Sequence, residues 1–257
     1  MAACASKPED NAQPFHSVDG RTLCVATDLP APGFWEGSAK HPTGGFEYEL
    51  AVDLAERFGL SGVRVVSASR SQLDQGVPSG CDLAIAEVTI TSERQQRMTF
   101  STPYYTTSLG VLTRAGTSVP DMYTAQSKSW GAEEGSRGAD FVQDTMQPDT
   151  AVKTFPNFDY EVRAVKDKIV DCVLDDLPLM LIAAKSDPSL DVAAQFLVND
   201  DYGIVVADVD NLDAVNVSLR NMLSDGTVDD LIDQWLTPRF EEDPADVSAI
   251  SFDPQAG

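Results

Sequence analysis

Residues 81–114, CDLAIAEVTITSERQQRMTFSTPYYTTSLGVLTR, place an arginine where it can bind an anion. The apolar run and the turn residues after it predict a strand that ends near Thr89 and a helix whose first turn contains Arg94. A cation in that turn opposes the helix dipole unless both face the same anion. Backbone N–H groups, the guanidinium fork and the Thr89 hydroxyl then converge on one carboxylate. The alternative is an exposed helical arginine beside Glu93.

Two later strand-to-helix turns carry polar side chains that suit a small charged ligand. In EEGSRGADF, residues 133–141, glycines flank Ser136 and Arg137 and allow the backbone to approach a bound group. Ser136 either hydrogen-bonds the anion or caps the next helix, and Arg137 is either a second anion contact or a solvated side chain. In DCVLDDLP, residues 171–178, Asp176 ends a strand. Its carboxylate either caps the next helix or binds a ligand ammonium.

The elements that must position these residues alternate strands with amphipathic helices, a pattern typical of parallel α/β sheets. In such sheets, ligands lie beyond the carboxyl ends of the strands. Asp28 ends the first strand and Glu87 lies near the end of the third, so both are expected at the cleft. Phe34 and Trp35 follow in a Pro/Gly loop and pack either on a ligand or on the protein. Strands are predicted over residues 21–28, 63–69, 81–90, 108–116, 168–176 and 202–207, with helices over 46–58 and on both sides of Asp225–Gly226.

The composition limits the partners. The chain has 257 residues, 42% of them hydrophobic, enough for one large or two small domains. With 41 acidic against 18 basic residues its net charge is −23, so nucleic acid and anionic membrane surfaces are poor partners. No apolar run reaches the roughly 20 residues of a membrane-spanning helix.

Only His16 and His41 are histidines, so we expect no metal centre, histidine-based triad or cofactor. The acidic tail after Pro238 is expected to be loose.

The cysteines fall in different settings. Cys4 follows two alanines in a polar N-terminus, residues 1–20, that is expected to be disordered. Small residues before a cysteine are typical of a lipoprotein processing site, so we expect Cys4 to carry a lipid anchor; the alternative is a chance cysteine in a tail. Cys24 and Cys81 lie in predicted strands and form either a disulfide or two buried thiols, with Cys172 left over.

Motifs in the correct order resemble those of the polar amino-acid solute-binding proteins of ABC transporters, extracellular solute-binding family 3. GGFEYELAVDLAERFGL resembles the family helix GFDxDLAxAIA, and residues 81–114 resemble DxxxAGMTITPERxxxVDFSxPYY. DCVLDDLPLMLIAAK resembles DAVVxDxPVAxYY. YGIVV and LSDGTVDDLIDQWL resemble YGIAV and DGTYDKIYxKW. The match runs over about residues 21–237, almost all of the chain that is expected to be ordered.

The resemblance implies a type II periplasmic-binding-protein fold, an α/β architecture of two lobes. Each lobe holds a mixed, mostly parallel sheet flanked by helices, and a two-strand hinge joins them. Lobe 1 is expected to hold residues 21–112 and 204–257, and lobe 2 residues 113–203. A monomer closes the lobes around one small molecule, and ABC-transporter permease subunits are the implied partners.

The resemblance also implies roles for single residues. The Thr and Arg of TITxER bind the ligand α-carboxylate in the family, a further position after the second-lobe glycine assists them, and the Asp of DxP binds the α-ammonium. The first-strand Asp and the aromatics after it line the side-chain pocket. By position these roles fall on Thr89 and Arg94, on Ser136 and Arg137, on Asp176, and on Asp28, Phe34 and Trp35.

Two departures from the family pattern add acidic groups. Glu87 stands where the family usually has Gly in AGMT, and the second-lobe strand ends in Glu133-Glu134. An acidic pocket favours a cationic side chain, such as that of arginine, lysine or ornithine, because a buried carboxylate needs a partner. The alternative is that Glu87 pairs with Arg137 or Arg70 and takes no part in recognising the charge of the ligand.

The leading function is therefore the extracytoplasmic amino-acid-binding component of an ABC importer, exported and lipid-anchored at the cell surface or in the periplasm, and not an enzyme. A first alternative is a cyclohexadienyl or arogenate dehydratase-like enzyme on the same fold, which needs a general acid such as Glu87 or Glu133. A second is the sensory ligand-binding domain of a receptor.

Overall fold

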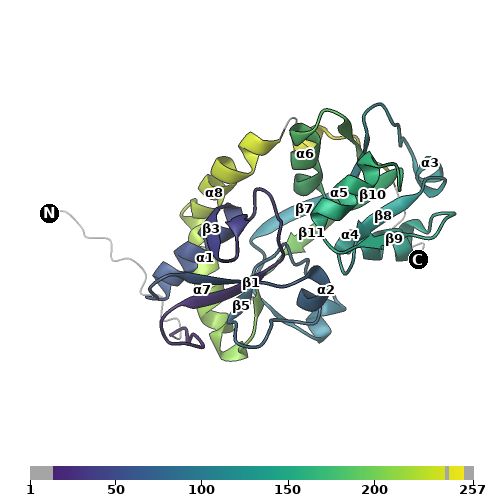
Figure 1. Cartoon of the computed structure of the whole chain (residues 1–257). Coiled ribbons are helices and arrows are strands. Elements are labelled where there is room, and N and C mark those ends of the chain that lie inside the picture. Colours follow the sequence, from purple (N-terminus) through teal and green to yellow (C-terminus); the bar gives the residue numbers. More distant parts are fainter. Residues whose placement is uncertain (1–13, 241–242, 252–257) are drawn as a thin grey trace.

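The computed structural model describes residues 14–240 and 243–251, which form two α/β lobes side by side (Figure 1). Cys4 and the rest of the expected N-terminal tail up to residue 13 lie outside the described residues. The first lobe is built on a five-stranded mixed sheet. Its strands, in spatial order, are β4 (Val63–Ser67), β1 (Leu23–Thr27), β5 (Leu83–Ala84), β12 (Val205–Val206) and β6 (Thr99–Phe100).

Helices cover this first sheet, and short elements line its edges. Helix α1 packs against both C-terminal helices, α7 and α8, and the latter two meet at Asp225–Gly226, as the sequence predicts. The elements are α1 (Phe46–Arg57), α2 (Arg70–Leu73), α7 (Leu212–Ser224), α8 (Thr227–Trp235), the hairpin of β2 (Glu36–Ser38) and β3 (His41–Gly44), and the 3-10 turns η1 (Arg94–Gln96), η3 (Val209–Asn211) and η4 (Thr237–Arg239).

The second lobe has its own five-stranded mixed sheet. In spatial order its strands are β11 (Leu190–Tyr202), β7 (Tyr105–Arg114), β10 (Cys172–Asp176), β8 (Trp130–Glu133) and β9 (Lys153–Phe155). The helices around it are α3 (Met122–Gln126), α4 (Arg137–Asp140), the π-helix η2 (Phe141–Met146), α5 (Phe158–Lys166) and α6 (Leu177–Ser186). The two sheets flanked by helices confirm the expected α/β fold class.

The antiparallel pair β7 and β11 connects the lobes and pairs Tyr105 with Tyr202 at the end nearer the first lobe. Among the described strands, β7 pairs with β11 and β10, both of the second sheet. The chain therefore leaves the first sheet before residue 105, and the boundary expected at residues 112 and 113 falls inside β7. The long hinge strands are part of the second sheet because their apolar residues complete its core.

The acidic tail beyond Pro238 is not loose over residues 243–251. The 3-10 turn η5 (Pro244–Asp246) precedes a segment that runs beside β11. The Gln195 amide donates to the Ser248 carbonyl at 2.9 Å, and Ile250 N donates to the Gln195 carbonyl at 2.8 Å. Ile250 is buried in the core of the second lobe. Residues 243–251 thus lie with the second lobe, although the sequence predicted them in the first. The buried side chain of Ile250 holds the segment there.

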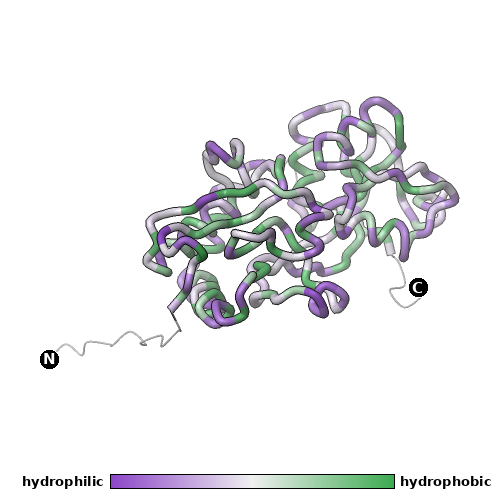
Figure 2. The backbone as a smooth tube through the Cα atoms, turned by 60° about the horizontal axis from the view of Figure 1, so that its bottom comes forward, coloured by the Kyte–Doolittle hydropathy of each residue, from purple (hydrophilic) through white to green (hydrophobic). Residues whose placement is uncertain are grey.

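The apolar core is continuous across the hinge, with a further cluster in each lobe. Figure 2 shows hydrophilic segments concentrated in the outer turns. Cys24 and Cys81 form a disulfide, with Cα atoms 4.7 Å apart, and Cys172 is a buried free thiol. Within the described part of the chain, no helix combines the length and the apolar character that crossing a membrane requires.

Candidate ligand-binding site

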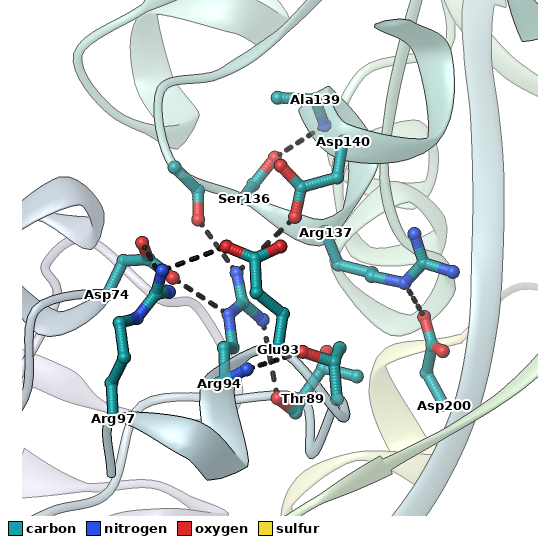
Figure 3. A network of polar contacts seen from close by, with 12 residues as sticks. Asp74, Thr89, Glu93, Arg94, Arg97, Ser136, Arg137, Ala139, Asp140 and Asp200 are labelled. Atoms are coloured by element: carbon teal, nitrogen blue, oxygen red, sulfur yellow. Dashed lines mark hydrogen bonds and ion pairs between the residues drawn. The ribbon is translucent and has the colours of Figure 1, made fainter. Parts of the chain in front are cut away.

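The guanidinium of Arg94 lies between the lobes (Figure 3) and is 5% exposed. Its Nε donates to Asp74 Oδ1 at 2.8 Å and its Nη1 to the Thr89 carbonyl at 3.3 Å, both in the first lobe. Its Nη2 donates to the Gly135 carbonyl of the second lobe at 3.1 Å. One edge of the fork is thus held by its own lobe, and the other reaches across the cleft.

The helix expected around Arg94 is only the single 3-10 turn η1. Three residues align too few peptide dipoles for the dipole argument to apply, so that expectation is wrong. Likewise, the predicted strand over 81–90 contracts to β5, because the backbone turns at Glu87, where φ is +46°. Thr89 follows this turn and is 1% exposed. Its hydroxyl has no hydrogen-bond partner among the described residues, which leaves it free to donate to an anion beside Arg94.

Ser136 occupies the N-cap of α4, where its Oγ accepts a hydrogen bond from Ala139 N at 3.1 Å. The capping alternative is therefore realised, and the hydroxyl proton is still able to point to an anion. The preceding Gly135 has φ of +81°, and a Cβ there would lie 2.9 Å from Ser71 Cα of the first lobe. Only glycine permits both this conformation and this approach of the lobes.

Asp176 occupies the N-cap position of α6 but makes no side-chain cap hydrogen bond. It is 3% exposed, and its Oδ1 has no partner within the described structure. The neighbouring Asp175 instead accepts from Asp176 N at 2.8 Å. Burial, together with the charge of Asp175, raises the pKa of Asp176 well above its usual range. Such a carboxylate gains a partner when an ammonium enters the cleft.

Glu87 pairs with Arg70, one of the two partners that the sequence analysis left open. Arg70 Nη2 lies 2.8 Å from Glu87 Oε2, and Nη1 donates to the Ala86 carbonyl. Arg70 begins α2, which Ser69 and Gln72 fix with a reciprocal capping box. Arg70 was not among the residues predicted to bind the ligand, although S-x-x-Q after a strand and its place at a carboxyl strand end were signals for it.

The remaining predicted residues are engaged elsewhere or stand behind the cavity. Trp35 is buried and donates from Nε1 to Glu47 Oε2 at 2.7 Å, and Phe34 is enclosed by aromatic rings. Neither lines the cleft, because the loop that carries them folds back onto the first-lobe core. Arg137 lines the cleft but pairs through Nε with Asp200 Oδ2 of β11 at 3.1 Å.

Both lobes line a cavity of about 10 Å³ between them, roughly the space of one water molecule. Its walls include Arg70, Glu87 and Arg94 from the first lobe and Ser136, Arg137 and Asp176 from the second. Asp28 lies behind this wall, 7% exposed, with Oδ2 lacking a donor among the described residues. An amino acid needs far more room, so the lobes must move apart to admit one and must close less tightly around it.

This arrangement suits recognition of a zwitterion. The Arg94 guanidinium lines the cavity from one lobe, with the Thr89 hydroxyl buried nearby. Asp176 lines it from the other lobe; its carboxyl lies beside the Tyr202 hydroxyl, and its Oδ1 has no partner among the described residues. The first group matches a ligand carboxylate and the second a ligand ammonium. A molecule that carries both charges can therefore bridge the lobes.

The family model of the bacterial extracellular solute-binding proteins, family 3, matches residues 23–238. The chain belongs to this family. It is 26% identical over 216 residues to ABC transporter arginine-binding protein 1 of Escherichia coli (strain K12), an alignment that covers 79% of this chain and 86% of the relative. It is 25% identical over 268 residues to the glutamine-binding protein of an ABC transporter from Bacillus subtilis (strain 168), with 96% and 94% covered.

Among solved structures, this family-3 protein superposes on an ancestral arginine-binding protein bound to arginine with a TM-score of 0.76. The sequences are 27% identical, and the match covers 83% of this chain and 97% of that one. The same ancestral protein has also been solved bound to glutamine. The likeness establishes the type II periplasmic-binding-protein fold for this chain.

Proposed function

We propose that this protein is the extracytoplasmic substrate-binding component of an ABC importer and closes its two lobes around an L-amino acid. The observation that carries the proposal is the opposition of Arg94 and Asp176 across one cleft. Each bears a charge that the α-group of an amino acid complements. Closure on the ligand creates the surface that permease subunits recognise.

To bind the ligand, Arg94 has to exchange one hydrogen bond and a longer ion pair of its Nη2 with Asp140 Oδ2, at 3.8 Å (Figure 3). In the closed cleft its Nη2 donates to the Gly135 carbonyl, at the edge of the fork that faces the second lobe. A ligand α-carboxylate takes this edge of the fork, with Thr89 and Ser136 hydroxyls as further donors. The hydrogen bond of Arg94 Nε to Asp74 keeps the fork oriented while this exchange occurs.

The ligand that suits the cleft best is a basic amino acid: arginine, lysine or ornithine. Asp28 and Glu133 come from opposite lobes and are buried, and each has a carboxyl oxygen that no N–H group among the described residues reaches. A cationic side chain brings several N–H donors to them. Several matched proteins are named for arginine. Other matched names, for glutamine, cystine and histidine, show how widely specificity varies at this level of identity.

The same proposal extends to location. Cys4 would carry a lipid that anchors the exported monomer to the membrane. Expression of the native gene with a labelled fatty acid tests this extension: we expect label on the wild-type chain and none on Cys4→Ser, and label on both variants would overturn it.

One observation favours the dehydratase alternative. Burial raises the pKa of Glu133 to about 10, so its carboxyl is protonated at neutral pH and able to act as a general acid. Asp176 argues against a simple dicarboxylate substrate, since two like charges would meet. Incubation with prephenate or arogenate decides this point, because turnover of either would replace the importer proposal.

The proposal as a whole is tested with a thermal-shift screen. The protein is unfolded and refolded to remove carried-over ligand, then mixed with the L-amino acids, ornithine, citrulline, dicarboxylates and prephenate. A ligand at 100 times its Kd adds about 2.7 kcal/mol, enough to raise the Tm by a few degrees. A rise with arginine, lysine or ornithine is expected. A rise only with neutral or acidic amino acids would refute the basic preference, and no rise with any amino acid would refute the function.

A further inference from the structure

Five buried carboxyl groups meet where the lobes face each other, and the family resemblance assigns no joint role to them. Asp28 and Glu87 come from the first lobe, and Glu133, Glu161 and Asp175 from the second. All are at most 7% exposed. We refer to these five residues as the carboxyl cluster. The cluster is assembled only when the lobes are together, because its members come from both.

Arg70 is the cation of this cluster within the described residues. It binds Glu87 directly, at 2.8 Å, and its charge acts on Glu133, Asp28 and Asp175. Its Nε has no acceptor. The other two arginines of the cleft are held by carboxylates outside the cluster, Arg94 by Asp74 and Arg137 by Asp200. Two further buried carboxyls also feel the charge of Arg70, Asp176 of the cleft and Glu47 of α1, which accepts from Glu87 N at 2.8 Å. One guanidinium therefore faces the five carboxyls of the cluster and these two.

Two contacts within the cluster join acid to acid. The carboxyl of Glu133 lies within hydrogen-bonding reach of Asp28 across the cleft, and that of Glu161 within reach of Asp175. Neither pair can form a hydrogen bond without a proton between the oxygens, and two ionised carboxylates at this distance repel each other. No group of three metal-ligating side chains in the described structure could hold a metal ion in place of those protons.

The electrostatics agree with this geometry. Burial, and the hydrogen bond to Asp28, raise the pKa of Glu133 to about 10. Burial, and the charges of Asp175 and Glu133, raise the pKa of Glu161 well above its usual range. Arg70 acts in the opposite direction on both. The closed cluster therefore holds protons at neutral pH.

We propose that the ligand-free protein, closed as in this structure, holds protons in the carboxyl cluster and exchanges them for the cationic side chain of a basic amino acid, so that binding releases protons to solvent. The inference rests on the proposed function, since it needs an amino acid in the cleft. Asp28 and Glu133 are the specificity-determining residues of the exchange. The ligand cation takes the position of the shared proton, Glu133 becomes a carboxylate, and that one proton leaves for the buffer.

The exchange separates ligands by charge. A neutral side chain gives the cluster no cation, so the protons stay and none are released. A basic side chain competes with protons, so the affinity of the protein for a basic ligand increases as the pH rises from 6 to 9. The affinity for a neutral ligand of the same shape does not increase over this range. Arg70 limits the exchange, because it already neutralises one of the carboxylates.

Isothermal titration calorimetry counts the protons. L-arginine, L-lysine and L-ornithine are titrated into the wild-type protein at pH 7 in phosphate, imidazole and Tris, whose ionisation enthalpies differ. The slope of observed enthalpy against ionisation enthalpy gives the protons released. We expect about one proton per basic ligand and none for L-citrulline, the neutral analogue of arginine. Zero release with a bound basic ligand would overturn the inference.

Two matched variants locate the exchange. Glu133→Gln removes the proton that Glu133 shares with Asp28, so the release should fall by at least half and the affinity for arginine by roughly tenfold. Glu134→Gln, at the exposed neighbouring position, should leave both unchanged. If Glu133→Gln does not fold, the comparison of arginine with citrulline on the wild-type protein still decides.

The outcomes also separate this inference from the proposed function. Failure of every amino acid to bind would refute the function. Binding of arginine without proton release, or an equal release with citrulline, would refute only the proton exchange and leave the amino-acid site in place.

Discussion

At the scale of single residues, the site depends on groups whose partners are incomplete. Asp176 ends a strand at a helix N-cap yet caps nothing, and the Thr89 hydroxyl is buried without a partner among the described residues. Buried polar groups without partners cost about 1–3 kcal/mol each. Leaving them so is costly for folding, and the zwitterion of the proposed function would offer a partner to both.

Arg94 is the first residue to change. We expect Arg94→Ala to lower amino-acid affinity at least 100-fold, about 2.7 kcal/mol, because a charge-assisted fork to the α-carboxylate is lost. Its Asp74 partner is partly exposed and keeps Arg97, so the fold should persist. Calorimetry measures the affinity and circular dichroism the fold.

Arg97→Ala is the matched control for this change. Arg97 also pairs with Asp74 but lies at the rim, 39% exposed at its side chain. Its loss should change the affinity less than threefold. Equal losses for the two variants would show that the Asp74 pairing, and not a ligand contact, explains the effect.

Glu87→Gly should change ligand ranking while the backbone is preserved. The φ of +46° at this position suits glycine, so the turn itself loses nothing. Arg70, freed from Glu87, neutralises the rest of the carboxyl cluster, and basic ligands should weaken roughly tenfold against citrulline. The ratio of the two Kd values is the measurement, and an unchanged ratio would rule out a charge role for Glu87.

At the scale of elements, strand-to-helix turns bring the lobes together. The turn between β8 and α4 meets the start of α2 at Gly135, and Arg94 donates to the carbonyl of that glycine. The hinge strands β7 and β11 belong to the second sheet, so opening must bend the short links to the first sheet at residues 101–104 and 203–204. The segment 243–251 adds to the rigid side of this hinge, since Gln195 Nε2 donates to the carbonyls of Pro244 and Val247 at 2.8 Å each.

Gly135→Ala tests the meeting of the lobes. The new Cβ would lie 2.9 Å from Ser71 Cα, so the closed form should become less favourable and ligand affinity should fall at least tenfold. Gly116→Ala carries the same positive-φ penalty, with φ of +80°, but its Cβ meets nothing within 4 Å. If both variants lose stability equally and only Gly135→Ala loses ligand affinity, the contact between Gly135 and Ser71 controls closure of the lobes. Equal ligand affinities of the two variants would contradict this role.

At the scale of the whole molecule, the carboxyl cluster should make stability depend on pH. The pKa of Glu133 is raised from 4.5 to about 10 in the folded protein, so between these values the folded chain holds a proton that the unfolded chain has lost. Unfolding therefore releases this proton, and the free energy of unfolding falls as the pH rises. Asp19, whose pKa is lowered from 3.8 to about 2, acts only at more acid pH.

The expected result for the ligand-free protein is a higher Tm at pH 5 than at pH 8, measured by differential scanning calorimetry. Glu133→Gln should reduce this difference, because the amide has no proton to release, and Glu134→Gln should not. A Tm that rises from pH 5 to pH 8 by the same amount in all three proteins would contradict the assignment.

The fold class and the order of the site motifs follow from the amino-acid sequence alone. Alternation of strands with helices predicts the two α/β layers, and positions at strand ends predict Thr89, Ser136 and Asp176 near a cleft. In the structure Ser136 and Asp176 line one cavity with Arg94, and the Thr89 carbonyl accepts from Arg94. The hydrophobic periodicity and the order of the elements are enough for this prediction, since the end of a strand is defined by residues that are neighbours in the sequence. Glu133 also lies at a strand end, although it was not predicted to bind the ligand.

Which charges meet depends on contacts between residues that are distant in the sequence. The tertiary structure paired Glu87 with Arg70, held Arg137 on Asp200, turned Phe34 and Trp35 into the core, and joined Cys24 to Cys81. It also brought the carboxyl of Glu161, on α5, beside that of Asp175, a contact that no motif in the sequence predicts. Ion pairs between distant residues depend on how two lobes approach through space, and burial of a carboxylate depends on every element around it, so neither property is encoded in local spacing.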